Sequence, residues 1–76
     1  MDNKATTEAL YDITMYGLRL HHFRTQQKIT VEKLAEMVDV SPRFITQIES
    51  GERKGSVPTL INIANALNVS LGSLFQ

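Results

Sequence analysis

Apolar residues recur at helical spacing in the central third of the chain. Leu34, Ala35 and Val38 share one face of a first short helix, and Thr30 is suited to cap its N-terminus. The pattern breaks at residues 39–40, and a second run with the same spacing then begins. This stretch therefore predicts two short helices joined by a tight turn.

The second of these helices has two different faces. Ser41 and Pro42 suit its start, as a capping hydroxyl and a first-turn proline, and Gly51 suits its end. Ile45 and Ile48 lie on the inner side, where they can pack against the first helix. The outward side spans an arc of roughly 140° and carries Pro42, Arg43, Thr46, Gln47 and Ser50. Arginine, threonine and glutamine can hydrogen-bond base edges, so the pattern predicts a helix that reads DNA.

A longer helix is predicted before this pair, over residues 7–25. Its main stripe follows three-four spacing and comprises Leu10, Ile13, Tyr16, Gly17, Leu20 and Arg24. A weaker stripe at the same spacing comprises Tyr11, Met15, Leu18 and His22. The sequence leaves two interpretations of this second stripe open: partial burial against the last helix of the domain, or a surface for a partner.

Two further helices are predicted after Gly51. A polar loop with two adjacent cations, Arg53 and Lys54, leads to Ser56, which can cap the next helix. Pro58 is tolerated in the first turn of that helix, whose predicted buried face comprises Leu60, Ile61, Ile63, Ala64 and Leu67. Asn68 can adopt the left-handed conformation that ends it, and Ser70 can begin a last short helix with Leu71, Leu74 and Phe75.

Two blocks of this sequence resemble a known family. LAEMVDVSPRFITQIESGER is similar to the central signature of the Cro and lambda-repressor type of helix-turn-helix regulators, the XRE family, and TLINIANALNVSLGSLF is similar to its closing two helices. The resemblance covers residues 16–75. It implies an all-α, five-helix, lambda-repressor-like DNA-binding domain over residues 16–76, with the second and third helices forming the helix-turn-helix. Residues 1–15 are then an N-terminal extension that lengthens the first helix.

The family resemblance also implies roles for individual residues. The recognition helix, residues 41–50, enters the major groove of double-stranded DNA, and the side chains expected to read bases are Pro42, Arg43, Thr46 and Gln47. The residues expected to hold the DNA backbone are Thr30, Ser41, Ser50, Arg53 and Lys54. Arg24 and Glu49 match family positions that form a partly buried ion pair. Leu71, Leu74 and Phe75 match the family's usual dimer region, which favours a homodimer on an inverted-repeat operator.

Four positions depart from the family pattern. Asp39 and Asn68 replace glycines, and both residue types tolerate the left-handed conformation at some cost. Gly55 stands where the family has a proline. Val31 stands where the family has a polar residue, often glutamine, that contacts phosphate. Only the backbone amide of Val31 can make that contact, so one standard DNA contact is weakened.

Composition fits a small DNA-binding domain with one exception. Seventy-six residues, 42% of them hydrophobic, make one domain near the lower size limit for a self-sufficient core. The formal net charge of zero argues against nucleic acid, because such domains are usually basic. Residues 1–15 hold three acidic residues and one basic one, however, whereas the remainder holds seven basic and five acidic ones. The weak bulk charge therefore predicts modest non-specific affinity and leaves specific binding possible.

Several other classes are excluded. The chain has no cysteine, no glycine-rich phosphate loop and no Ser/His/Asp arrangement, so we expect neither an enzyme nor a cofactor. His21 and His22 point about 100° apart on a helix and lack ligand-type neighbours, so they are interpreted as surface histidines and not as a metal site. No apolar run approaches the ~20 residues of a membrane span and no signal peptide is present, which favours a cytoplasmic protein of a prokaryote or phage.

The function expected from this sequence is that of a sequence-specific transcriptional regulator, in particular a repressor. The alternative is a protein-interaction module, such as an antitoxin or anti-repressor, that binds another protein through the N-terminal helix or the Leu71–Phe75 end. Zero net charge and Val31 favour the alternative slightly, whereas Arg53 and Lys54 favour DNA.

Overall fold

The structure is a computed structural model that describes residues 16–75, and the regular secondary structure of this part of the chain is entirely α-helix. Residues 16–26 form a first helix, followed by α2 (Val31–Val38), α3 (Pro42–Ser50), α4 (Val57–Ala66) and α5 (Leu71–Leu74). The predicted all-α, five-helix architecture is confirmed. The predicted turns before residue 16 lie outside the described residues.

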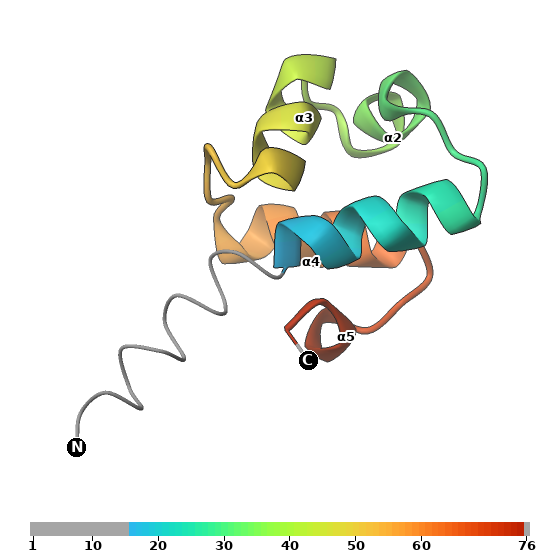
Figure 1. The fold of residues 1–76 in the computed structure, drawn as a ribbon, viewed down its shortest axis with the longest axis vertical. Coiled ribbons are helices and arrows are strands. Elements are labelled where there is room, and N and C mark those ends of the chain that lie inside the picture. The colour runs from blue at the N-terminus through green and yellow to red at the C-terminus, as the bar shows by residue number, and fades with distance from the viewer. Residues whose placement is uncertain (1–15, 76) are drawn as a thin grey trace.

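The helices enclose one core. Figure 1 shows α2 and α3 at one end of the domain and α5 at the other, with helix 16–26 and α4 between them. The buried apolar residues come from all five helical segments and the residue that follows α4: Tyr16, Leu20, Leu34, Ala35, Ile45, Ile48, Leu60, Ile63, Ala64, Leu67 and Leu74. No helix within residues 16–75 has the length and apolar character to cross a bilayer.

Serine and threonine hydroxyls begin four of the helices. Thr30, Ser41, Ser56 and Ser70 are the N-caps of α2 to α5, and each accepts a hydrogen bond from the backbone N–H three residues later. An N-cap of this kind stabilises a helix by about 1 kcal/mol. The predicted helix starts are therefore confirmed.

Residues with positive φ lie at or just beyond the ends of the first four helices. Gly51 follows α3 with φ 87°, and three residues other than glycine also have positive φ: Lys28 at 61°, Asp39 at 59° and Asn68 at 59°. The left-handed geometry predicted for Asp39 and Asn68 is confirmed, whereas Lys28 was not expected to adopt it. A lysine gains no local hydrogen bond that favours this region, so the backbone cost at Lys28 is offset by the surrounding fold.

Three predictions of burial need correction or completion. The sequence predicts Ile61 on the buried face of α4, but Ile61 is 41% exposed, because it lies about 100° around the helix from Leu60 and outside the arc of the other core residues. The family resemblance predicts Leu74 at a dimer interface, but Leu74 is 0% exposed, because it completes the core of its own domain. Leu18 is 54% exposed, so the described part of the second N-terminal stripe is not buried against the last helix.

Gly17 allows helix 16–26 to approach α3 closely. A Cβ atom at Gly17 would lie 2.4 Å from the carbonyl oxygen of Ile48 and 2.9 Å from that of Glu49. Both atoms belong to the backbone, so neither can move aside as a flexible side chain can. Glycine is thus required at this contact by the space available, not by its φ angle.

Two side chains also join the first helix to distant segments. The Tyr16 hydroxyl accepts a hydrogen bond from the backbone N–H of Gly55 at 3.1 Å, and the ring of Tyr16 packs edge-on against Phe75 with centroids 5.5 Å apart. The Gln27 side chain donates to the carbonyl oxygen of Leu67 at 2.6 Å, just beyond the last turn of α4. These contacts hold both ends of helix 16–26 against the rest of the domain.

We expect Gly17→Ala to destabilise the domain by about 1–3 kcal/mol, because the new methyl group forces helix 16–26 away from α3. Urea unfolding followed by circular dichroism measures the loss. Gly72→Ala in α5 is the matched control, since the nearest atom to its Cβ is 3.9 Å away, and it should leave stability equal or slightly raised. Equal midpoints for Gly17→Ala and the wild type would contradict the close contact.

Candidate nucleic-acid interface

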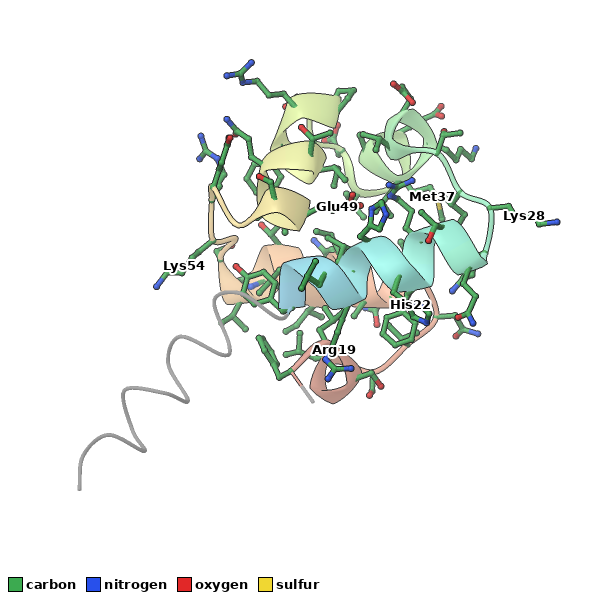
Figure 2. The ribbon with its side chains drawn as sticks, in the orientation of Figure 1. Arg19, His22, Lys28, Met37, Glu49 and Lys54 are labelled. Carbon is green, nitrogen blue, oxygen red and sulfur yellow. The ribbon has the colours of Figure 1, made fainter. Side chains whose placement is uncertain are left out.

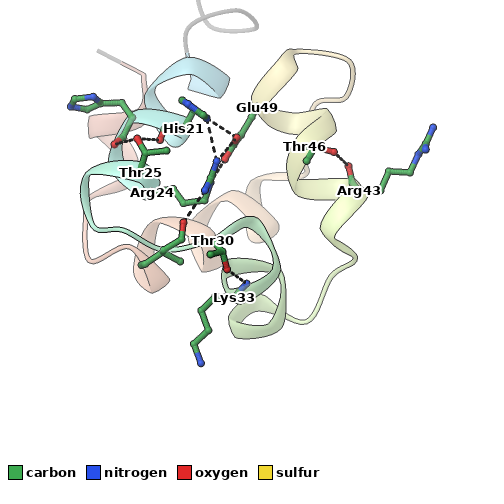
Figure 3. Close-up of polar contacts among 10 residues, drawn as sticks. His21, Arg24, Thr25, Thr30, Lys33, Arg43, Thr46 and Glu49 are labelled. Atoms are coloured by element: carbon green, nitrogen blue, oxygen red, sulfur yellow. Dashed lines mark hydrogen bonds and ion pairs between the residues drawn. The ribbon is translucent and has the colours of Figure 1, made fainter.

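The outward side of α3 is a continuous polar surface. Pro42, Arg43, Thr46 and Ser50 are exposed and Gln47 is half-buried, while Ile45 and Ile48 on the opposite side are fully buried. Figure 3 shows the Arg43 side chain extending away from the domain. The structure thus brings the four side chains predicted to read bases onto one surface.

The hydroxyl groups on α3 are already engaged by their own helix. Thr46 Oγ1 donates to the carbonyl oxygen of Arg43 at 2.9 Å, which leaves Thr46 an acceptor oxygen and a methyl group to offer a ligand (Figure 3). Ser50 Oγ donates to the carbonyl oxygen of Gln47 at 3.1 Å and accepts from the N–H of Glu52 at 3.4 Å. In this arrangement Ser50 has no proton to donate to a phosphate, which argues against its predicted backbone role.

The hydroxyls of the N-cap residues Thr30 and Ser41 accept hydrogen bonds from their helices, whereas those of Thr46 and Ser50 donate. Thr30 Oγ1 accepts from the N–H of Lys33 at 3.0 Å, and Ser41 Oγ accepts from the N–H of Phe44 at 3.1 Å. Each hydroxyl therefore keeps its own proton for an acceptor outside the helix. Each also stands at a helix N-terminus, where the partial positive charge favours anions.

The loop after α3 folds back on the helix through Arg53. The Arg53 N–H donates to the carbonyl oxygen of Gln47 at 3.2 Å, and Arg53 Nε donates to Gln47 Oε1 at 3.1 Å. The guanidinium carbon lies 5.5 Å from the centre of the Phe44 ring, within cation–π range. Lys54, in contrast, points away from the domain (Figure 2). The two adjacent cations are therefore held differently.

A buried ion pair fixes α3 to the first helix. Arg24 Nε donates to Glu49 Oε2 at 2.6 Å and Arg24 Nη2 donates to Glu49 Oε1 at 3.1 Å, so the contact is bidentate. Arg24 Nη1 also donates to the carbonyl oxygen of Ile29 at 2.8 Å, ahead of α2. The side chains of Arg24 and Glu49 are 10% and 9% exposed. The ion pair predicted from the family resemblance is present.

His21 joins this cluster, which the sequence did not predict. His21 Nδ1 lies 2.9 Å from Glu49 Oε1 and 3.3 Å from Arg24 Nη2 (Figure 3). A carboxylate only accepts hydrogen bonds, so Nδ1 carries the proton and donates to Glu49. His21 Nδ1 and Arg24 Nη2 are then both donors, so the 3.3 Å contact between them is not a hydrogen bond. The interpretation of His21 as a surface histidine is confirmed, since its side chain is 55% exposed, but its contact with Glu49 was not predicted.

Comparison with known proteins identifies the family. A family profile described as Helix-turn-helix matches residues 20–74, most of the chain. This chain belongs to the Cro/C1-like (XRE) helix-turn-helix family. It is 36% identical over 62 residues to the HTH-type transcriptional regulator YqaE of Bacillus subtilis, and the match spans 82% of this chain and 53% of that protein. The chain therefore covers about half the length of this relative.

Two solved structures share the helix-turn-helix fold in different contexts. The restriction-modification controller protein C.AhdI of Aeromonas hydrophila is 28% identical with a TM-score of 0.80, and the match covers 84% of this chain and 97% of that one. Hydroxypropylphosphonic acid epoxidase of S. wedmorenis is 28% identical with a TM-score of 0.77, over 83% of this chain but only 34% of the epoxidase. Because this fold occurs both alone and as part of an enzyme, its role here is argued from the α3 surface.

The Arg24–Glu49 pair of this helix-turn-helix domain shifts the acid–base properties of both groups. Burial alone would raise the pKa of Glu49, but hydrogen bonds from Arg24 and His21 and the charges of both outweigh it and lower that pKa below its ordinary value. The hydrogen bond to Glu49 raises the pKa of Arg24. A lowered carboxyl pKa in the folded state stabilises the fold above the unfolded value, and this contribution is lost as pH falls through the folded value.

We expect Glu49→Ala to lower the free energy of unfolding by about 3–5 kcal/mol at neutral pH, because it leaves Arg24 buried and unpaired. Urea unfolding at pH 7 and at lower pH measures this loss. The gap between Glu49→Ala and the wild type should begin to narrow below about pH 4, the ordinary range of a glutamate carboxyl, and should close as the pH falls through the lowered folded pKa of Glu49. Exposed Glu52→Ala is the control and should change stability by less than about 0.5 kcal/mol. A gap that stayed constant from pH 7 to the acid limit would contradict the charge-dependent contribution.

Proposed function

We propose that this chain binds double-stranded DNA in a sequence-specific manner and regulates transcription, acting as a repressor. One observation carries the proposal: the outward face of α3 collects an arginine, a threonine and a glutamine that are free of the core, with two cations in the loop directly behind them. Occupancy of an operator by such a domain is sufficient to obstruct transcription, so repression requires no further activity of this chain.

In the proposed complex, α3 enters the major groove with its N-terminus first. Arg43, in the first turn, reaches deepest and can donate two hydrogen bonds to guanine O6 and N7. Thr46 offers an acceptor oxygen and a methyl group, which suit an amino group of adenine or cytosine and the thymine methyl. Pro42 and Gln47 flank these two residues on the same face.

The DNA backbone would be held at the edges of this face. The hydroxyl protons of Thr30 and Ser41 can be donated to phosphate oxygens, and the backbone N–H of Val31 at the start of α2 replaces the contact that its side chain cannot make. The exposed Lys54 supplies a positive charge that can neutralise a phosphate. Ser50 is left out of this set because its proton is donated within α3.

We expect Arg43→Ala to weaken binding to the preferred operator by about 1–3 kcal/mol and to relax base preference at one position, because a bidentate base contact is lost. Lys54→Ala should instead weaken binding to all duplexes by a similar factor and lower the slope of log affinity against log salt by about one. Operators selected from a random duplex pool, followed by salt titration of binding, supply both measurements.

The two variants separate base reading from positioning. If Arg43→Ala weakened selected and random duplexes equally, Arg43 would be a phosphate contact and not a base contact. If the wild-type protein showed no salt-dependent binding to any duplex, the proposal of DNA binding would fail as a whole.

A homodimer on an inverted repeat is part of the proposal, because one module of this size buries limited DNA surface. The α5 end remains the proposed contact, now through Leu71 and Phe75 without the buried Leu74. Leu71 is the better residue to test, since Phe75 also packs on Tyr16 within the same domain.

We expect Leu71→Ser to shift the protein toward monomer and to lower affinity for a two-half-site operator, while affinity for one half-site stays almost unchanged. Analytical ultracentrifugation and binding to the two operator forms measure these effects. Val57→Ser, at an apolar residue that is 60% exposed on another helix, is the control and should remain dimeric. If Leu71→Ser stayed dimeric and Leu18→Ser became monomeric, the dimer contact would be formed by the N-terminal helix and not by the α5 end.

A protein-interaction module remains the competing function. The observation that favours it is the exposure of large apolar side chains away from α3, at Leu18, Met37 and Ile61. A chain that binds only protein would show no salt-dependent retention on random duplex DNA, so the titration described above also discriminates between the two functions.

A further inference from the structure

Arg53 fixes the orientation of the Gln47 side-chain amide. Arginine has only donor groups, so the atom of the amide that faces Arg53 Nε at 3.1 Å must be the oxygen Oε1. The amide nitrogen of Gln47 is then turned away from Arg53. Its two N–H groups are the part of the amide that can serve a ligand at the α3 surface.

Arg53 is itself held by three contacts, and these contacts stabilise the orientation of the Gln47 amide. Its backbone N–H donates to the Gln47 carbonyl oxygen at 3.2 Å, its guanidinium lies over the Phe44 ring, and its Nε holds the Gln47 oxygen. Phe44 and Gln47 are both half-buried residues of α3. The loop after α3 therefore controls a side chain in the middle of the proposed reading face.

A glutamine with its oxygen engaged reads a base differently from a free glutamine. Free glutamine pairs with adenine by accepting from N6 and donating to N7, which requires both amide atoms to face the base edge. Here the oxygen faces the loop, so only donors remain for the base. Guanine presents two acceptors in the major groove, O6 and N7, and no donor there. The positive charge of Arg53 beside the amide also favours the electronegative edge of guanine.

We infer that Arg53 is a specificity-determining positioning residue that makes Gln47 a donor to guanine instead of a partner for adenine. This inference rests on the proposed DNA-binding function and deepens it. It also gives Arg53 a different role from Lys54, although the sequence predicts both as backbone contacts.

The test compares base preferences among variants. Operators are selected from a random duplex pool with the wild type and with Gln47→Ala, Arg53→Met and Lys54→Met. Gln47→Ala should lose preference at one base pair of each half-site, which identifies the position that Gln47 reads. There the wild type should bind guanine about tenfold more tightly than adenine. Arg53→Met should remove or reverse that ratio, whereas Lys54→Met, which removes an adjacent cation, should preserve it.

The decisive measurement is the ratio of affinities for two duplexes that differ only at this base pair. The ratio does not depend on the fraction of protein that is folded, nor on the general loss of affinity when a cation is removed. An unchanged ratio in Arg53→Met, an adenine preference in the wild type, or a Gln47→Ala protein with unchanged preferences would each overturn the inference while leaving DNA binding intact. A wild type that enriches no sequence would overturn the proposed function and the inference with it.

Discussion

The orientation of α3 depends on the contact between Arg24 and Glu49. A helix of nine residues is too short to be stable alone, so its direction is set by what its inner side touches. Ile45 and Ile48 supply apolar contact, but apolar contact is not directional. The bidentate pair adds two hydrogen bonds of fixed geometry, and the third bond from Arg24 to Ile29 extends the same link toward α2. Gly17 permits this geometry because a side chain there would hold the first helix and α3 apart.

The parts of the fold that could be predicted from the sequence are those with local causes. A capping hydroxyl, a first-turn proline or a left-handed terminus acts within a few residues, so Ser41, Pro42 and Gly51 were sufficient to place α3. Errors arose where burial depends on packing between helices. Ile61 has the chemistry of a core residue but lies on the wrong side of α4, and Leu74 completes a core that a pattern of four residues cannot reveal.

The candidate site was predictable to a similar extent. Helical periodicity and the family resemblance together indicate which side chains face outward, but not how their polar atoms are already used. The bond from Arg53 to Gln47 and the bond from His21 to Glu49 depend on side-chain rotamers, and the second joins residues 28 positions apart. A signal for His21 existed in its position one helical turn before Arg24, although spacing alone cannot distinguish an exposed histidine that contacts the ion pair from one that contacts nothing.

The three left-handed residues that are not glycine have a consequence for how this domain can evolve. Lys28 holds a conformation that costs an ordinary residue about 1 kcal/mol or more, Asp39 and Asn68 hold it at a smaller cost, and glycine would adopt it at little cost. Substitution of glycine at these positions in turns would therefore stabilise the domain, and none of the positions belongs to α3. A lineage could gain this stability one substitution at a time and thereby tolerate destabilising changes on the outward face of α3, so that surface can change without loss of the fold.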